Sequence, residues 1–303
     1  MNVIASRAVA TAREGLQKTV NLYSEKRPKL YTDIVGNVLT DNQKYMEIAQ
    51  VGDFGMATPI AEGTPVAYDD FATPYTKQYS VIMRAIGFKV SEQAKVTDIY
   101  NIVSQPAAKI ALAMDKTMEQ VGANVINLMT STATANLGPD AVALASVSHP
   151  TLGGLATNRP ATDLAFSASA LAQAIQELMK QKSHRGDPLP AMGPFNLYVP
   201  PDLADVANRV VNSRQQAQTA NNDPNWAGGL ISKICVNPYF TSTTAWALRS
   251  VDNAEHGLFC LKRIARQTKS EYDINVLGWK IVTFEEYVCG NYDWRGFWGT
   301  TGA

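Results

Sequence analysis

The side chains of this chain that are most able to bind a metal or take part in a reaction are three histidines and three cysteines. A histidine cluster could hold a metal ion or move protons, but His149, His184 and His256 fall in separate expected loops. His149 precedes a proline, a pairing that we interpret as a turn. The cysteines are odd in number and far apart, which favours free thiols of a protein made in the cytosol; they are Cys235, Cys260 and Cys289. The sequence therefore predicts neither a metal centre nor a cofactor site.

The acidic residues give no catalytic pair. Glu285 and Glu286 are adjacent in an expected strand, so their side chains face opposite sides and make a poor acid–base pair. Asp293 and Arg295 flank Trp294, which predicts a local structural ion pair. The chain lacks the motifs G-x-x-x-x-G-K-[ST], G-x-G-x-x-G, H-E-x-x-H and G-x-S-x-G. These absences disfavour an enzyme, although a site assembled in space needs no local motif.

Charge is balanced over the 303 residues but unevenly distributed. The 27 Lys and Arg residues match the 27 Asp and Glu residues, whereas a dedicated nucleic-acid binder usually has a basic excess. Residues 1–30 carry six basic and two acidic side chains, a local excess of +4 that includes Arg7, Arg13 and Lys18. The sequence contains no run of about 20 apolar residues, so it predicts no membrane-spanning helix. Scattered charges at the N-terminus argue against a secretory signal.

Residues 106–130 predict one long helix, about 35–40 Å in length. Pro106 suits a first helical position. Apolar residues recur at steps of three and four along one face: Ile110, Met114, Met118, Val121, Val125 and Leu128. Gly122 should cost about 1 kcal/mol relative to alanine, so we expect another backbone to approach the helix closely there.

The segment 53–71, DFGMATPIAEGTPVAYDDF, is the least globular part of the chain. It is rich in glycine and proline, carries four acids, and lies between extended segments at 44–51 and 74–90. Two extended segments joined by such a tip predict a protruding hairpin, which is marginal alone because it has little to bury. The alternative is a surface hairpin folded back on its own domain.

A second region with mixed helices and strands begins near Thr162. Helices are expected at 164–181 and 203–213, the second with Asp202 as its N-cap. Strands are expected at 195–199, 230–236, 245–249, 258–261, 272–276 and 279–288. Because helices and strands do not alternate regularly, the pattern predicts an α+β fold.

Short motifs follow one another in a definite order from about residue 45 onward. They are Gly52-Asp53-Phe54-Gly55, Glu62-Gly63-Thr64-Pro65, Tyr75, Tyr79, 91–100, Ser148-His149-Pro150, 171–182, Gly186-Asp187-Pro188-Leu189, 197–203, Asn237-Pro238, Trp246-Ala247-Leu248, and Gly290 with Asp293-Trp294-Arg295. In this order they resemble the major capsid proteins of tailed bacteriophages, and more narrowly the major head subunit family of Mu-like phages. Each motif is short, and their order carries the resemblance.

The resemblance implies an HK97-like capsid fold with four parts. These are an N-terminal arm at 1–45, an extended loop at 46–84, a peripheral domain at 85–162 and 266–303 around a spine helix at 106–130, and an axial domain at 163–265. Because the chain starts with Met and its arm is short, we expect no cleaved scaffolding segment. No catalytic or cofactor-binding residues are carried over, because the family is structural.

The resemblance also implies the partners and the location of the protein. The expected partners are further copies of this chain in hexamers and pentamers, a portal protein, decoration proteins where the particle carries them, and packaged double-stranded DNA by non-specific proximity. We expect assembly in the host bacterial cytoplasm and a final place in the virion, with no membrane partner.

We predict that the extended loop contacts a neighbouring subunit, with opposite charges on the loop and the arm favouring the correct surface. The predicted contact residues are Phe54, Met56, Ile60, Glu62, Val66, Tyr68, Asp69, Asp70 and Phe71 of the loop, and Arg7, Arg13 and Lys18 of the arm. Two alternatives stay open from the sequence: a bacterial encapsulin-like nanocompartment shell, and an uncharacterised α+β enzyme.

Overall fold

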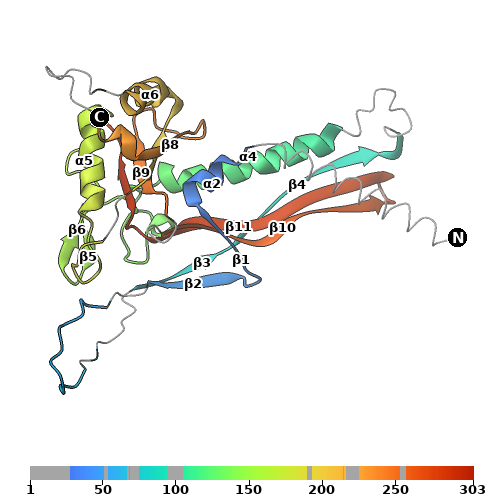
Figure 1. Ribbon diagram of the computed structural model, residues 1–303. Helices are drawn as coiled ribbons and strands as arrows, with labels where there is room; N and C mark the ends of the chain where they lie inside the picture. The colour runs from blue at the N-terminus through green and yellow to red at the C-terminus, as the bar shows by residue number, and fades with distance from the viewer. Residues whose placement is uncertain are drawn as a thin grey trace.

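Two four-stranded sheets organise the chain, and a long helix runs beside one of them (Figure 1). The computed structural model describes residues 28–50, 54–66, 68, 75–93, 105–189, 193–213, 215, 225–252 and 257–303. The N-terminal arm is described only from residue 28 onward, so Arg7, Arg13 and Lys18 lie outside the described residues. The expected short helix between Ser91 and the long helix also lies outside them, apart from its first residues.

The longer sheet has the order β1-β10-β11-β4. Its strands are β1 (Asn37–Thr40), β10 (Gly257–Asp273), β11 (Gly278–Asp293) and β4 (Ile82–Ser91). β1 runs parallel to β10, and the other neighbours are antiparallel. The sequence predicts β10 as two short pieces, because residues 262–271 are mostly polar. Several of these side chains have partners on β11: the hydroxyl oxygens of Thr268 and Thr283 lie 3.0 Å apart, and Arg263 pairs with Glu286. Others face solvent, and the strand continues without a break.

The long helix predicted over 106–130 is α4 (Gln105–Asn127), and it lies along one face of this sheet (Figure 1). It ends three residues earlier than the expected Thr130. Its predicted apolar face is correct in the first half, where Ile110, Met114 and Met118 are buried. In the second half the buried side is instead that of Ala123 and Ile126, and Leu128 is 41% exposed, because another helix packs onto α4 there.

That helix is α2 (Leu30–Val35), and it meets α4 at Gly122. A Cβ atom on Gly122 would lie 2.4 Å from the Cβ of Tyr31 and 3.3 Å from its Cα. The close backbone approach expected from this glycine is therefore confirmed. Even an alanine at this position would push the two helices apart.

The second sheet has the order β12-β9-β7-β8. Its strands are β12 (Phe297–Thr300), β9 (Trp246–Ser250), β7 (Phe195–Val199) and β8 (Ile231–Val236). Alternate residues of β7 enter two different cores: Leu197 packs with α5 (Ala168–Met179) and α6 (Ala204–Asn212), whereas Tyr198 packs with α2. Both faces of this sheet are therefore covered. Asp202 does not cap α6 but lies in a preceding 3₁₀ turn, η3 (Pro201–Leu203).

Shorter elements complete the fold. β2 (Tyr45–Gln50) and β3 (Tyr75–Ser80) form one antiparallel ribbon, and β5 (His149–Thr151) and β6 (Gly154–Ala156) form another. Two further 3₁₀ turns are η2 (Thr134–Asn136) and η4 (Gly228–Leu230). Within the described part of the chain, no helix combines the length and apolar character that crossing a membrane would require. The architecture is α+β, as expected.

Candidate functional site

The ribbon of β2 and β3 carries a projecting loop, which we define as residues 54–68. Figure 1 shows its described part extending away from both four-stranded sheets. Ala61 and Thr64 close a turn in it, since the Thr64 amide donates to the Ala61 carbonyl at 3.1 Å. Gly63 has a φ of 83° in this turn, a conformation that favours glycine. The described part of the projecting loop is thus an extended segment with one tight turn.

The root of this loop is fixed to the body of the protein. Tyr79 of β3 donates its hydroxyl hydrogen to the carbonyl of Asn291, and its ring meets Phe259 edge-on with centroids 5.0 Å apart. Tyr75 donates to the carbonyl of Pro150 at 3.2 Å. Lys77 donates to the carbonyl of Leu137, and burial lowers the pKa of Lys77. These contacts fix the direction in which the loop extends from the body of the protein.

The loop exposes many apolar side chains to solvent. Exposed fractions are 60% for Phe54, 71% for Met56, 52% for Ile60, 58% for Val66 and 96% for Tyr68. Single exposed apolar residues are ordinary on a protein surface, whereas a contiguous set usually marks an interaction site. Among the described residues, this set marks the loop as a candidate interaction surface.

Only part of the predicted contact set can be placed. Phe54, Met56, Ile60, Val66 and Tyr68 lie exposed on the projecting loop, and Glu62 is exposed at its turn. The remaining predicted residues lie outside the described part of the chain: Asp69, Asp70, Phe71, Arg7, Arg13 and Lys18. Whether loop and arm carry complementary charge into one contact stays a prediction.

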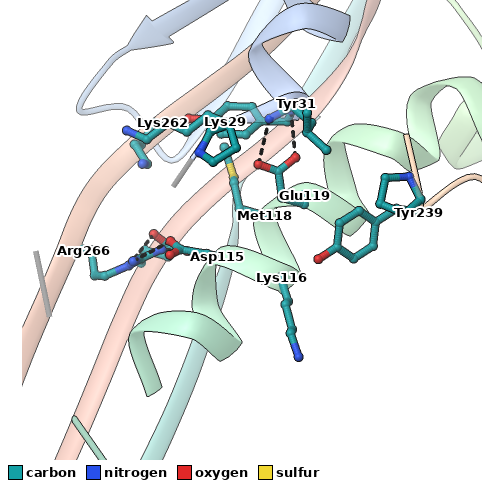
Figure 2. Close-up of a pocket in the computed structure, with 13 residues that line it drawn as sticks. Lys29, Tyr31, Asp115, Lys116, Met118, Glu119, Tyr239, Lys262 and Arg266 are labelled. Atoms are coloured by element: carbon teal, nitrogen blue, oxygen red, sulfur yellow. Dashed lines mark hydrogen bonds and ion pairs between the residues drawn. The ribbon is translucent and has the colours of Figure 1, made fainter. Parts of the chain in front are cut away.

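A cavity of about 390 Å³ lies between α2, α4 and the longer sheet (Figure 2). At its centre the Glu119 carboxylate of α4 accepts hydrogen bonds from the backbone amides of Leu30 at 3.0 Å and Tyr31 at 2.8 Å. A side chain of one helix thus caps the N-terminus of another. Burial raises the pKa of Glu119, and the two amide donors oppose this shift.

Three other charged groups of the cavity pair with one another. Arg266 of β10 lies 2.8 Å from a carboxylate oxygen of Asp115 and 3.3 Å from one of Glu285. The three side chains form a network that ties α4 to the sheet beneath it. Because these carboxylates and Glu119 are engaged in pairing or capping, the cavity presents no poised acid, base or nucleophile among them. The role of these charged groups is structural: they connect α2, α4 and the longer sheet.

The structure corrects the expectation for His149. This residue lies in β5 rather than a turn and is fully buried. Its Nδ1 lies 2.6 Å from a carboxylate oxygen of Asp140, its Nε2 lies 3.1 Å from the side-chain oxygen of Asn158, and its ring stacks on Trp294 with centroids 4.3 Å apart. Its hydrogen-bond partners lie nine residues before and after it, and its stacking partner Trp294 lies far along the chain. The neighbouring Pro150 could not reveal these contacts.

No metal centre forms among the described residues, since no group of three or more His, Cys, Asp and Glu side chains could hold an ion. His184 lies against the ring of Tyr75 rather than beside His149, and His256 lies outside the described part. Cys260 and Cys289, far apart in sequence, are cross-strand neighbours on β10 and β11. The spacing of the cysteines gave no signal for this pairing, which depends on the register of the hairpin.

Two structural expectations are confirmed. Glu285 and Glu286 point to opposite sides of β11, where Glu285 pairs with Arg266 and Glu286 pairs with Arg263 at 2.8 Å. Asp293 pairs with Arg295 at 2.9 Å. The described residues thus place these acids in ion pairs within the fold.

Comparison with known proteins identifies the family. A family model described as phage capsid protein matches residues 74–299, about three quarters of the chain. The chain belongs to the phage capsid protein family. A phage capsid protein is a structural component of the virion that assembles with further copies of itself, so the enzyme alternative is wrong. No protein with a curated description matches this capsid protein.

Solved structures share the fold at low sequence identity. The capsid of the cyanophage P-SCSP1u is 14% identical, with a TM-score of 0.57 and coverage of 87% of this chain and 85% of that chain. The procapsid of bacteriophage JBD30 is 13% identical, with a TM-score of 0.53 and coverage of 100% and 77%. The encapsulin SrpI of Synechococcus elongatus PCC 7942 is 10% identical, with a TM-score of 0.53 and coverage of 91% and 88%.

These likenesses show the HK97-like fold of the capsid protein and confirm the expected fold class. The encapsulin has the same fold, so the fold alone does not separate a phage head from a nanocompartment. The family match makes that distinction in favour of a phage capsid. The narrower likeness to Mu-like phages belongs to the proposal below.

Proposed function

We propose that this protein is the major head subunit of a Mu-like tailed phage. In this proposal hexamers and pentamers of the chain build an icosahedral shell around double-stranded DNA. The procapsid of bacteriophage JBD30, solved in an icosahedral symmetry, supports the architecture by its fold. The short motifs from residue 45 onward support the narrower Mu-like assignment.

One observation carries the proposal: a fixed root supports a projecting loop on which large apolar side chains, among them Met56 and Tyr68, are exposed in the described single subunit. Each large apolar side chain that becomes buried contributes about 1.5–3 kcal/mol. Part of this gain is offset, because the loop is ordered and each subunit loses freedom of motion on binding. A heterologous contact repeated around a ring then closes a capsomer, and each contact can be modest because every subunit makes several.

We infer a peripheral domain at 85–162 with 266–303 and an axial domain at 163–265, in addition to the arm at 1–45 and the loop at 46–84. The predicted boundary at 265/266 falls inside β10 (Gly257–Asp273), so this strand would belong to both parts. The spine helix α4 and the longer sheet would form the peripheral part. The sheet of β7, β8 and β9 with α5 and α6 would form the axial part at the capsomer centre. β12 pairs with β9, so this late strand would join the axial side although it follows the peripheral segment in sequence.

The charge arrangement gives the proposal a direct test. Segment 53–71 carries four acids and no basic residue, so we infer that it meets a basic surface of the next subunit. Changing Glu62, Asp69 and Asp70 together to lysine should block shell formation while the subunit keeps its circular dichroism spectrum and unfolding midpoint. Negative-stain microscopy and size-exclusion chromatography would measure assembly.

The matched control keeps the charges and changes only their reach, with Glu62→Asp, Asp69→Glu and Asp70→Glu. This variant should assemble like the parent. Normal shells from the lysine variant would refute charge pairing at the loop. A second variant, Met56→Ser with Tyr68→Ser, removes apolar side chains and leaves the charges intact. It tests the apolar part of the loop contact separately and should weaken assembly at any salt concentration.

The proposed partners of the shell follow from its role. A portal protein would occupy one vertex, and decoration proteins would bind outside where the particle carries them. The zero net charge of the chain suits a wall along which packaged DNA slides rather than adheres. Particles purified from infected cells should contain phage DNA. Shells that hold a cellular enzyme and no DNA would favour a nanocompartment instead.

A further inference from the structure

Two thiols meet in the longer sheet at a place where the shell contacts proposed above make no use of them. Cys260 of β10 and Cys289 of β11 are direct cross-strand partners. Their sulfur atoms lie 2.8 Å apart, with the Cys289 thiol donating a hydrogen bond to Cys260 Sγ. Directly opposed residues of antiparallel strands have Cα atoms about 4.5–5.5 Å apart, which falls within the range that a disulfide spans. The backbone is already placed for a bond.

We propose that Cys260 and Cys289 form a reversible oxidation site, at which a peroxide converts the two thiols into a cross-strand disulfide. One thiol, as its thiolate, attacks a peroxide oxygen and becomes a sulfenic acid, and the first water leaves. The sulfur of the second thiol then displaces the sulfenic hydroxyl group, which leaves as the second water. In total two thiols and one hydrogen peroxide give one disulfide and two waters, with both sulfurs oxidised and the peroxide reduced.

The surroundings of the pair keep it reduced during synthesis. The hydrogen bond to Cys260 raises the pKa of the Cys289 thiol, burial raises it further, and the positive charges of Arg84 and Lys262 oppose the shift only in part. Because the thiolate is the reacting form, such a thiol reacts slowly near neutral pH. A bacterial cytosol also keeps thiols reduced, whereas a released particle meets an oxidising medium.

The position of the pair gives the bond a mechanical consequence. Cys289 precedes Gly290, whose Cα lies so close to the ring of Tyr79 that an added Cβ would be 2.7 Å from it. Tyr79 anchors the root of the projecting loop, and Cys260 is the register partner of Val38 on β1. A disulfide here would therefore hold β10 and β11 together at the place where the loop is attached.

The proposal concerns a bond within one chain and does not depend on the proposed shell. The full-length protein, reduced and then freed of reductant, would be treated with hydrogen peroxide, denatured, alkylated and digested for mass spectrometry. We expect a linked pair of peptides containing Cys260 and Cys289 that is two hydrogens lighter than the reduced pair, with Cys235 alkylated. Dithiothreitol should restore three alkylated cysteines.

A stability measurement adds a second readout. The oxidised protein should unfold at a higher guanidinium concentration than the reduced protein. This shift should persist in Cys235→Ser, the matched control, and vanish in Cys289→Ser. Because serine at the fully buried Cys260 could impair folding, Cys260→Ala provides the second loss-of-bond variant.

Several results would overturn the oxidation site. They are full alkylation of both cysteines after peroxide, a sulfinic acid in place of the bond, a link between two chains, or an unfolding shift that survives in Cys289→Ser. If shells fail to form but the intrachain bond appears in free subunits, the assembly proposal fails and the oxidation site stands. If shells form but peroxide produces no intrachain bond, the oxidation site fails and the assembly proposal stands.

Discussion

The capping of α2 by Glu119 leads to a prediction whose size follows from the structure. In Glu119→Ala the amides of Leu30 and Tyr31 lose their acceptor, while α2 still packs on α4 at Gly122. Each buried donor left without a partner costs about 1–3 kcal/mol. Since the Leu30 amide is only partly buried, we expect a total loss of about 2–4 kcal/mol in the free energy of unfolding.

Glutamine at the same position separates shape from charge. Glu119→Gln keeps one acceptor oxygen but turns an amide group toward the second N–H, and it removes the negative charge from the helix N-terminus. Because burial raises the pKa of Glu119, removing the charge also relieves part of an unfavourable burial. The expected loss is therefore smaller, about 1–2 kcal/mol.

Two assays would measure the effect. Guanidinium unfolding of the free subunit gives the global loss, and hydrogen exchange at the Leu30 and Tyr31 amides reports local opening of α2. Lys116→Ala is the matched control, since Lys116 is an exposed neighbour on the same helix, and it should change stability by less than about 0.5 kcal/mol. A loss below about 0.5 kcal/mol in Glu119→Ala, with unchanged exchange at both amides, would refute the capping argument.

Three further predictions concern charged groups held in hydrogen bonds or ion pairs. Hydrogen bonding from Arg159 holds the pKa of Asp163 well below its usual range; Asp163→Asn should therefore be less stable at neutral pH, and the deficit should shrink as pH falls below about 3.8, in thermal melts across a pH series. Arg266→Met leaves two carboxylates unpaired beneath α4 and should lower the free energy of unfolding by about 3–5 kcal/mol in guanidinium. His149→Phe keeps the ring stack but leaves Asp140 buried without its partner, so urea unfolding should show a loss of about 2–4 kcal/mol, and a loss below about 1 kcal/mol would contradict this account.

Much of the fold was predictable where local pattern decides structure. The helix over 106–130, the strand over 195–199 and the projecting hairpin follow from periodicity, β-branched and aromatic content, and the Gly/Pro-rich tip. Gly122 also predicted a tertiary contact, because a glycine inside a long helix indicates a close approach by another part of the chain. The part that approaches it is Tyr31. The family resemblance added the domain plan, which no local pattern contains.

The rest depends on partners far away in sequence. Polar residues of β10 did not indicate a strand, because partners such as Thr283 for Thr268 and Glu286 for Arg263 are reached only after β11 has paired. The stacking of His149 depends on Trp294, and the meeting of Cys260 with Cys289 depends on register. Register is a property of the assembled sheet, so a single sequence without an alignment does not display it.

The pairing of β12 with β9 sets the order in which a newly made chain can mature. Trp298 of β12 packs against Trp246 of β9, with ring centroids 4.8 Å apart, inside the core shared with α5. Residues 297–300 leave the ribosome after every other strand of both sheets, so that core stays open until synthesis has passed them. A chain that stops before residue 297 therefore lacks β12 and leaves this core incomplete.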